Sequence, residues 1–181
     1  MERPKKKIVL GVTASIAIYK ACELVRRLKE CGFMVRVVMT KEAEQLVNPV
    51  VFASLSANKV YRADIFDAPE EWEIEHVSLA EEADLILIAP ATANIIAKLA
   101  TGICDDLLTC TVCASRKNIL IAPAMNENMY SNKITQSNIA KLKSCGYKFI
   151  APRKGMLACG KTGLGCLADL EDIVKEVKKY L

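Results

Sequence analysis

The chain has 181 residues, of which 52% are hydrophobic and 25% are charged, so it can build one substantial core and is not an intrinsically disordered protein. No apolar stretch approaches the roughly 20 residues that a membrane span requires. The net charge of +4 comes largely from basic residues near the two ends, and only 6% of the residues are aromatic, which disfavours nucleic-acid binding.

The first half of the sequence alternates strand and helix signals. A β-branched apolar run at 7–13 predicts a strand, and apolar residues at helical spacing over 16–31, ended by Gly32, predict a helix. The strand signal returns at 33–39, and Thr40 is suited to cap the helix that follows it. This half therefore has the order strand, helix, strand, helix.

The second half continues the alternation. Uninterrupted apolar runs at 84–89 and 118–122 are typical of strands buried on both faces of a parallel sheet. The other predicted elements are helices at 93–100, 107–114, 135–145 and 170–181 and a short strand at 148–150, with an exposed loop at 61–75. This order predicts an α/β fold for residues 1–181, a single-domain open parallel sheet of the Rossmann or flavodoxin type with helices on both faces.

Ligands of such a sheet bind beyond the carboxyl ends of its strands, so the loops there are candidate sites. After the first strand, Thr13 and Ser15 offer hydroxyls beside a helix N-terminus, which favours a phosphate. The turn lacks the G-x-G-x-x-G fingerprint, which disfavours an ordinary NAD domain and suits a mononucleotide. Alternatively, Ser15 only caps the helix.

Two further loops follow the central strands. In Pro-Ala-Thr-Ala-Asn-Ile at 90–95, small residues let a flat ring approach the backbone while Thr92 and Asn94 supply donors and acceptors, although the segment also fits an ordinary capped helix start. The loop at 123–130, Pro-Ala-Met-Asn-Glu-Asn-Met-Tyr, is more specific, and a purely structural role is disfavoured.

One histidine and one glycine-rich segment add candidate chemistry. His76 is the only histidine; a lone histidine in a loop is more often incidental than catalytic, although the residue type suits a general base. Residues 155–165 hold four of the eight glycines around Cys159, which predicts a flexible lid with a reactive thiol. The same letters match a phosphate-binding loop, but no strong strand leads into it and no helix is predicted at Lys161, which disfavours that site.

The eight cysteines are interpreted as free thiols of a reducing compartment rather than as disulfide partners. Disulfide scaffolds are usually shorter than about 100 residues, and the first residues carry no secretory signal pattern, so a cytoplasmic protein is expected. Cys110 and Cys113 have CxxC spacing, but no second pair completes the four ligands of a zinc site. Packing is predicted for Cys22, Cys31, Cys104, Cys110, Cys113 and Cys145, while Cys166 is left open.

Taken together, these loops resemble the flavin-containing cysteine decarboxylase family. The segment at 90–95 resembles the family's Pro-Ala-Ser-Ala-Asn-Thr motif, with Thr92 and Ile95 as the differences. The segment at 123–130 resembles its Pro-x-Met-Asn-x-x-Met-Trp motif, with Tyr130 in place of Trp. Leu-Ala-Cys-Gly at 157–160 resembles its substrate-clamp loop. The resemblance covers nearly the whole chain.

The resemblance implies an FMN-dependent decarboxylation of 4'-phosphopantothenoylcysteine to 4'-phosphopantetheine in coenzyme A biosynthesis. Oxidation of the substrate thiol to a thioaldehyde would provide the electron sink for loss of CO2, and the resulting enethiol would then be reduced. The implied catalytic roles are a base for His76, a hydrogen bond to the substrate carboxylate for Asn126, and assistance in the reduction for Cys159. The implied substrate-binding residues are Met125, Asn126, Ala158 and Cys159.

The resemblance also implies the cofactor site and the partners. The cofactor-binding residues would be Gly11, Thr13, Ser15, Thr40, Thr92, Ala93 and Asn94, without a metal. The chain would form a homotrimer or a dodecamer of trimers with sites between subunits, and a phosphopantothenoylcysteine synthetase could be fused to it or associated with it.

Two alternatives come from different classes. The first is a flavoprotein of the same fold that decarboxylates a peptidyl C-terminal cysteine or transfers electrons. Simple electron transfer is disfavoured because His76, Asn126 and Cys159 are all present. The second is a non-catalytic regulatory subunit, which often carries a long acidic tail that this chain lacks.

Overall fold

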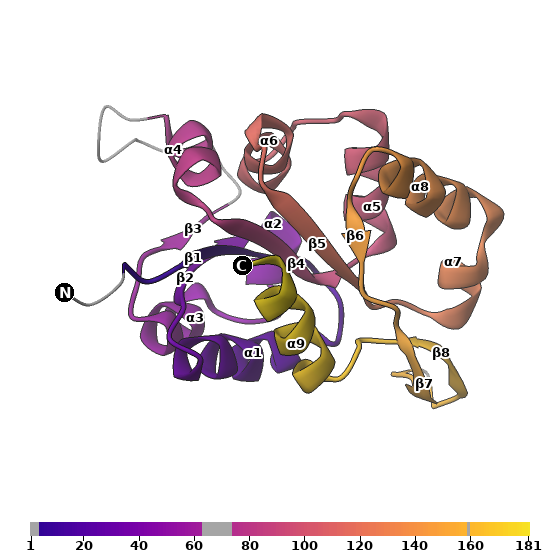
Figure 1. Cartoon of the computed structure of the whole chain (residues 1–181). Helices are drawn as coiled ribbons and strands as arrows, with labels where there is room; N and C mark the ends of the chain where they lie inside the picture. The colour runs from indigo at the N-terminus through magenta and orange to yellow at the C-terminus, as the bar shows by residue number, and fades with distance from the viewer. Residues whose placement is uncertain (1–3, 63–73, 159) are drawn as a thin grey trace.

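Six parallel strands form the central sheet of the computed structural model, in the order β3-β2-β1-β4-β5-β6 (Figure 1). The structure describes residues 4–62, 74–158 and 160–181, so Cys159 and most of the predicted loop at 61–75 lie outside the described residues. The strands of the sheet are β1 (Lys7–Val12), β2 (Met34–Met39), β3 (Val60–Tyr61), β4 (Leu85–Ala91), β5 (Asn118–Pro123) and β6 (Lys148–Phe149). This order is that of the Rossmann fold and decides between the two predicted types.

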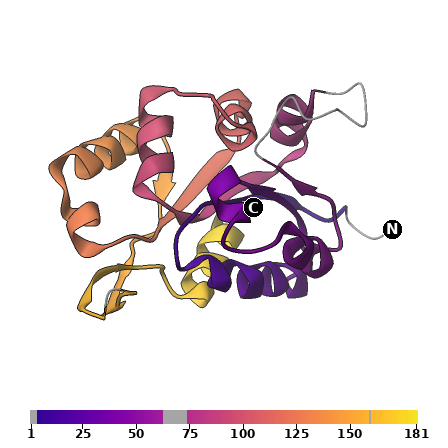
Figure 2. The same cartoon turned by 180° about the vertical axis from the view of Figure 1, so that it is seen from behind.

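Helices cover both faces of this sheet, as predicted (Figures 1 and 2). The helices are α1 (Ile18–Glu30), α2 (Lys41–Glu44), α3 (Pro49–Ser56), α4 (Glu75–Glu82), α5 (Ala93–Thr101), α6 (Leu107–Ala114), α7 (Glu127–Ser131), α8 (Lys133–Ser144) and α9 (Leu170–Tyr180). One layer contains α1, α3 and α9, and the other contains α4, α5, α6 and α8.

Two hydrophobic cores correspond to these two layers, because successive residues of a strand face opposite sides of the sheet. Ile8 and Leu10 of β1 belong to the core under α1, α3 and α9, together with Phe52. Val9 belongs to the other core, with Ile88 of β4. All seven residues of β4 are buried, which confirms that the apolar run at 84–89 is a strand covered on both faces.

The amino ends of β1 and β4 are joined by Asp84. Its Oδ2 accepts a hydrogen bond from the backbone N–H of Lys7 at 2.8 Å, and its Oδ1 pairs with Lys6 Nζ at 3.2 Å. The backbone bond, with the help of Lys6, lowers the pKa of Asp84. The carboxyl ends of the same strands lie at the opposite edge of the sheet, where a site can form.

The structure also contains elements that the sequence analysis did not predict. Asn48 caps α3 by accepting a hydrogen bond from the Val50 N–H, and Pro49 starts the helix, so a start signal was present in the sequence. The glycine-rich segment is an antiparallel hairpin of β7 (Arg153–Met156) and β8 (Thr162–Cys166), so the prediction of a loop without strands is wrong. As predicted, no helix begins at Lys161.

Within the ranges that the structure describes, no helix combines the length and the apolar character needed to cross a membrane.

Candidate functional site

A cavity of about 520 Å³ opens where the loops after β1, β4 and β5 meet the β7–β8 hairpin. It lies at the point where the strand order reverses between β1 and β4, which is where Rossmann folds bind their ligands. The predicted site residues that line it are Ser15, Thr92, Met125, Asn126 and Ala158. The fold therefore gathers five predicted residues from four separate segments into one site.

Thr13 joins two of the loops that form this site. Its hydroxyl donates a hydrogen bond to the Pro90 carbonyl at 2.7 Å and accepts one from the Thr92 N–H at 3.1 Å. The side chain is only 1% exposed. Thr13 therefore braces the β1 loop against the β4 loop, and the expected contact of its hydroxyl with a cofactor phosphate stays a prediction.

Gly11 and Thr40, two further residues expected to bind the cofactor, both have structural roles in the fold. Gly11 lies inside β1 facing α6, and a Cβ at this position would stand 2.6 Å from Cδ1 of Leu108. It is a packing glycine that lets α6 approach the sheet, and its expected place at the cofactor stays a prediction. Thr40 is 7% exposed, caps α2 by accepting a hydrogen bond from the Ala43 N–H, and does not line the cavity.

The start of α1 lies at the cavity. The Ser15 hydroxyl accepts a hydrogen bond from the Ala17 N–H at 3.3 Å, and Ser15 lines the cavity at the same time. The first turn of α1 has no acidic residue, and its N-cap residue makes no side-chain cap. The dipole of this helix therefore favours an anion in the cavity.

The loop after β5 is held between β4 and the hairpin. The Ala124 N–H donates to the Ala91 carbonyl at 3.0 Å, and the Met125 N–H donates to the Gly165 carbonyl at 3.0 Å. Gly165 has a φ of +153°, and a Cβ there would stand 2.1 Å from the Met125 carbonyl oxygen. Glycine is therefore required for the hairpin to approach this loop.

Asn126 occupies the centre of that loop and begins α7. Its Oδ1 accepts a hydrogen bond from the Asn128 N–H at 2.9 Å, and the side chain lines the cavity. The next residue, Glu127, accepts a hydrogen bond from the Leu164 N–H of β8 through Oε1 at 3.1 Å. The predicted carboxylate-binding residue is thus fixed in position by a helix cap and by the neighbouring hairpin.

The three predicted catalytic residues are not all placed in this cavity. Asn126 lines it, while Cys159 lies outside the described residues beside the lining residue Ala158. His76 lies in the first turn of α4, which packs against α6 in the far helical layer, and does not line the cavity (Figure 1). Within one chain, the fold does not bring His76 to Asn126.

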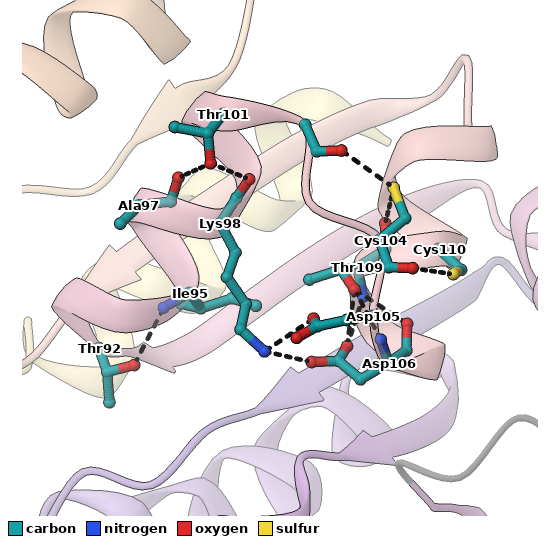
Figure 3. A network of polar contacts seen from close by, with 11 residues as sticks. Thr92, Ile95, Ala97, Lys98, Thr101, Cys104, Asp105, Asp106, Thr109 and Cys110 are labelled. Atoms are coloured by element: carbon teal, nitrogen blue, oxygen red, sulfur yellow. Dashed lines mark hydrogen bonds and ion pairs between the residues drawn. The ribbon is translucent and has the colours of Figure 1, made fainter.

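A polar network fixes the helix that begins at the predicted flavin-ring motif (Figure 3). The Thr92 hydroxyl caps α5 by accepting a hydrogen bond from the Ile95 N–H at 3.3 Å. Near the other end of α5, Lys98 Nζ pairs with Asp105 at 2.8 Å and with Asp106 at 3.2 Å. The motif therefore includes a capped helix start, and Thr92 also lines the cavity, whereas Ala93 and Asn94 do not.

The same region contains three cysteines with a shared environment. The Cys110 thiol donates to the Cys104 carbonyl at 3.4 Å. Desolvation of the sulfur, followed by the nearby thiols of Cys113 and Cys110, raises the pKa of Cys104 to about 11. Such a thiol is almost entirely protonated near neutral pH and is a weak nucleophile. In the part of the chain that the structure describes, no three His, Cys, Asp or Glu side chains are arranged to hold a metal ion.

The predicted packing of the cysteines is confirmed only in part. Cys22 and Cys31 pack against the core under α1. Cys104, Cys113 and Cys145 are exposed, so a packing role for them is wrong. Helical periodicity gives no sign of this, because the exposure of a short helix depends on what covers it. Cys166, left open by the sequence, lines the cavity, and its thiol donates to the Met156 carbonyl at 3.3 Å.

Sequence reasoning missed the charged residues of the cavity. Lys20 of α1 and Arg153 of β7 both line it. Lys20 lies in the first turn of α1, directly after the loop in which a phosphate was expected, and this position offered a signal. Arg153 offered none, because its place in the site depends on a hairpin that the sequence analysis did not predict.

Comparison with known proteins agrees with this geometry. The sequence model of the family described as Flavoprotein matches residues 1–181. The chain is 45% identical over 178 residues to a probable phosphopantothenoylcysteine decarboxylase of Streptococcus mutans, covering 97% of this chain and 99% of that protein. It is also 45% identical over 175 residues to the coenzyme A biosynthesis bifunctional protein CoaBC of Bacillus subtilis, of which it spans 43%.

Solved structures give the same result for the fold. A PPC decarboxylase mutant complexed with pantothenoylaminoethenethiol superposes with a TM-score of 0.88 at 30% identity and 98% coverage of both chains. The FMN-binding protein AtHal3 superposes with a TM-score of 0.84 at 30% identity, with coverage of 98% of this chain and 97% of that one.

Proposed function

The chain belongs to the flavoprotein family, and we propose that it is an FMN-dependent enzyme that decarboxylates 4'-phosphopantothenoylcysteine to 4'-phosphopantetheine in coenzyme A biosynthesis. One observation carries the proposal. A single cavity combines the start of α1 and Ser15, which suit a phosphate, with the Met125–Asn126 loop and Ala158, which suit a cysteinyl substrate. The relatives with matching names support the same activity.

The residues of the cavity fit FMN. The Ser15 hydroxyl provides a donor for its phosphate at the start of α1, and no acidic side chain stands in the first turn to repel it. The apolar side chains of Met125 and Leu167 line the same space and suit the face of a flat ring. When bound, FMN supplies the two-electron oxidation of the substrate and the later reduction of its product.

The chain's own residues bind and orient the substrate. Asn126 hydrogen-bonds the cysteinyl carboxylate and so orients the carbon–carbon bond that breaks when CO2 leaves. Met125 and Ala158 shape an apolar surround that excludes water, which favours loss of a charged carboxylate as neutral CO2. Cys159, next to Ala158, holds a proton for the last reduction step, and His76 takes the proton of the substrate thiol.

This assignment requires more than one subunit, because His76 does not line the cavity of its own chain. Around the cavity, Ile16 and Tyr19 are each 63% exposed and Met156 is 71% exposed. A neighbouring subunit would cover these apolar side chains and bring its own His76 to the site. A homotrimer, or a dodecamer of trimers, meets this need.

Residues 1–181 form one FMN-binding domain in this proposal. The chain spans 43% of the bifunctional relative from Bacillus subtilis and 99% of the Streptococcus mutans relative. A phosphopantothenoylcysteine synthetase is therefore either fused to such a domain or a separate partner that supplies its substrate. The reaction takes place in the cytoplasm.

The central test is cofactor and product analysis. Purified protein should carry about one FMN per chain and convert 4'-phosphopantothenoylcysteine to CO2 and 4'-phosphopantetheine. A peptide ending in cysteine should not be a substrate. Protein that cannot be reconstituted with FMN, or that prefers the peptide, would contradict the proposal.

Variants test the assigned residues. Cys159→Ser should still release CO2 but accumulate the unreduced enethiol, and His76→Asn should retain FMN but release no CO2. Coexpression of His76→Asn with Asn126→Asp should restore part of the activity that each lacks alone, because mixed trimers contain sites with both native residues. If mixed trimers stay inactive, His76 does not act across the interface.

A further inference from the structure

Among the residues that the structure describes, the charged side chains that line the cavity are all positive. Two cationic side chains, Lys20 and Arg153, line it, and no carboxylate does. Such a cavity favours a ligand with more than one negative group. Lys20 lies on α1, the helix proposed to hold the cofactor's phosphate, so Arg153 is the cation that remains for another anion.

Arg153 is held in a defined position at the base of the hairpin. Its Nε pairs with Asp169 Oδ1 at 2.9 Å, just before α9. Its Nη1 lies 2.9 Å from the point where Gly155 would carry a Cβ, so the guanidinium packs against this glycine.

These contacts leave donors for a ligand. A guanidinium has five N–H donors in a planar fork, and the ion pair with Asp169 engages the Nε side. The two outer nitrogens suit a bidentate contact with a phosphate, which a lysine ammonium does not provide. Because Asp169 fixes the side chain beforehand, little further ordering is needed on binding.

We propose that Arg153 binds the phosphate of the substrate and makes the enzyme selective for phosphorylated over unphosphorylated pantothenoylcysteine. This inference rests on the proposed function. The thiol and the phosphate lie at opposite ends of a long, flexible substrate. Arg153 lies at the base of β7 and Ala158 near the tip of the hairpin, and five extended residues span on the order of 15 Å. One hairpin can therefore contact both ends.

The test compares two substrates that differ only in the phosphate. Arg153→Gln should raise KM for 4'-phosphopantothenoylcysteine roughly 10- to 100-fold with little change in kcat, as expected for loss of a charged hydrogen bond. KM for pantothenoylcysteine should change less than about twofold. Arg153→Lys should recover part of the lost affinity, and the FMN content should be unchanged in both variants.

Lys154→Gln is the matched control, because Lys154 is the next residue of β7, is exposed and does not line the cavity. It should leave both KM values unchanged. An equal rise of KM for both substrates in Arg153→Gln would assign Arg153 a structural role and overturn the proposal. An unchanged KM for the phosphorylated substrate would also overturn it, because the phosphate would then bind elsewhere.

A binding measurement separates this inference from the proposed function. The dissociation constants of 4'-phosphopantetheine and pantetheine can be measured by calorimetry without turnover. Wild-type protein should bind the phosphorylated compound more tightly, and Arg153→Gln should remove that difference. If the protein shows this selectivity but no decarboxylation, the proposed reaction fails while the phosphate site stands. Equal binding of both compounds by the wild type overturns the phosphate site.

Discussion

Strand β4 and the β7–β8 hairpin hold their shapes by different means. Every residue of β4 is buried between two layers of helices. In the hairpin, most side chains are exposed, and Met156 is 71% exposed. The hairpin is held by backbone and side-chain contacts to the loop after β5, at Met125 and Glu127.

This difference shows that the residues that stabilise the fold and the residues that form the candidate site lie largely in different parts of the molecule. Burial of apolar area supplies most of the free energy of folding and is concentrated in the sheet. The hairpin contributes little buried apolar area, but several of its residues line the cavity. Substitutions in the sheet should therefore change the free energy of unfolding, whereas substitutions in the hairpin should change ligand binding.

The largest effect on stability is expected for Leu87→Ala in β4. Leu87 is fully buried, and its truncation should lower the free energy of unfolding by about 2–5 kcal/mol because a cavity replaces the side chain. Denaturant unfolding measures this. Leu164→Ala on β8, where Leu164 is 39% exposed, is the control and should cost less than about 1 kcal/mol. Similar losses in both variants would contradict the comparison.

An intermediate effect is expected for Thr13→Val, which lies where the sheet meets the site. Removing the hydroxyl leaves the Pro90 carbonyl and the Thr92 N–H without their partner, which should cost about 1–3 kcal/mol. FMN affinity should fall as well, because the two loops lose their brace. Thr13→Ser keeps the hydroxyl and should restore most of both quantities. A loss of FMN binding at unchanged stability would instead indicate direct contact with the cofactor.

The smallest effect on global stability is expected for Gly165→Ala. The new Cβ would collide with the Met125 carbonyl, so the hairpin should detach while the sheet remains folded. The free energy of unfolding should change less than in Leu87→Ala, because the clash is confined to the contact between the hairpin and the loop after β5. Limited proteolysis of the hairpin should become much faster, and KM for the substrate should rise.

Gly163→Ala is the control for that variant. Its Cβ would meet the carboxylate of Glu127, a flexible side chain that can move aside. It should therefore accelerate proteolysis less than Gly165→Ala does. Equal acceleration would show that crowding at the Met125 backbone is not the cause.

The sequence by itself determined most of the sheet, most of its covering helices and the loops that meet at the site. Apolar runs such as 84–89 and helical spacing such as that of 16–31 are local patterns, and secondary structure follows them when burial rewards the same residues. The loops after the strands were identifiable as candidate sites because parallel strands place their carboxyl ends at one edge.

Only the tertiary structure decided which side chains meet there. Thr13 and Pro90 are 77 residues apart in sequence, and their hydrogen bond depends on β1 and β4 being neighbours. The entry of Arg153 into the cavity likewise depends on the docking of a hairpin whose exposed, glycine-rich strands carry little hydrophobic pattern. Periodicity reports burial along one element, whereas these contacts depend on which elements the fold brings together.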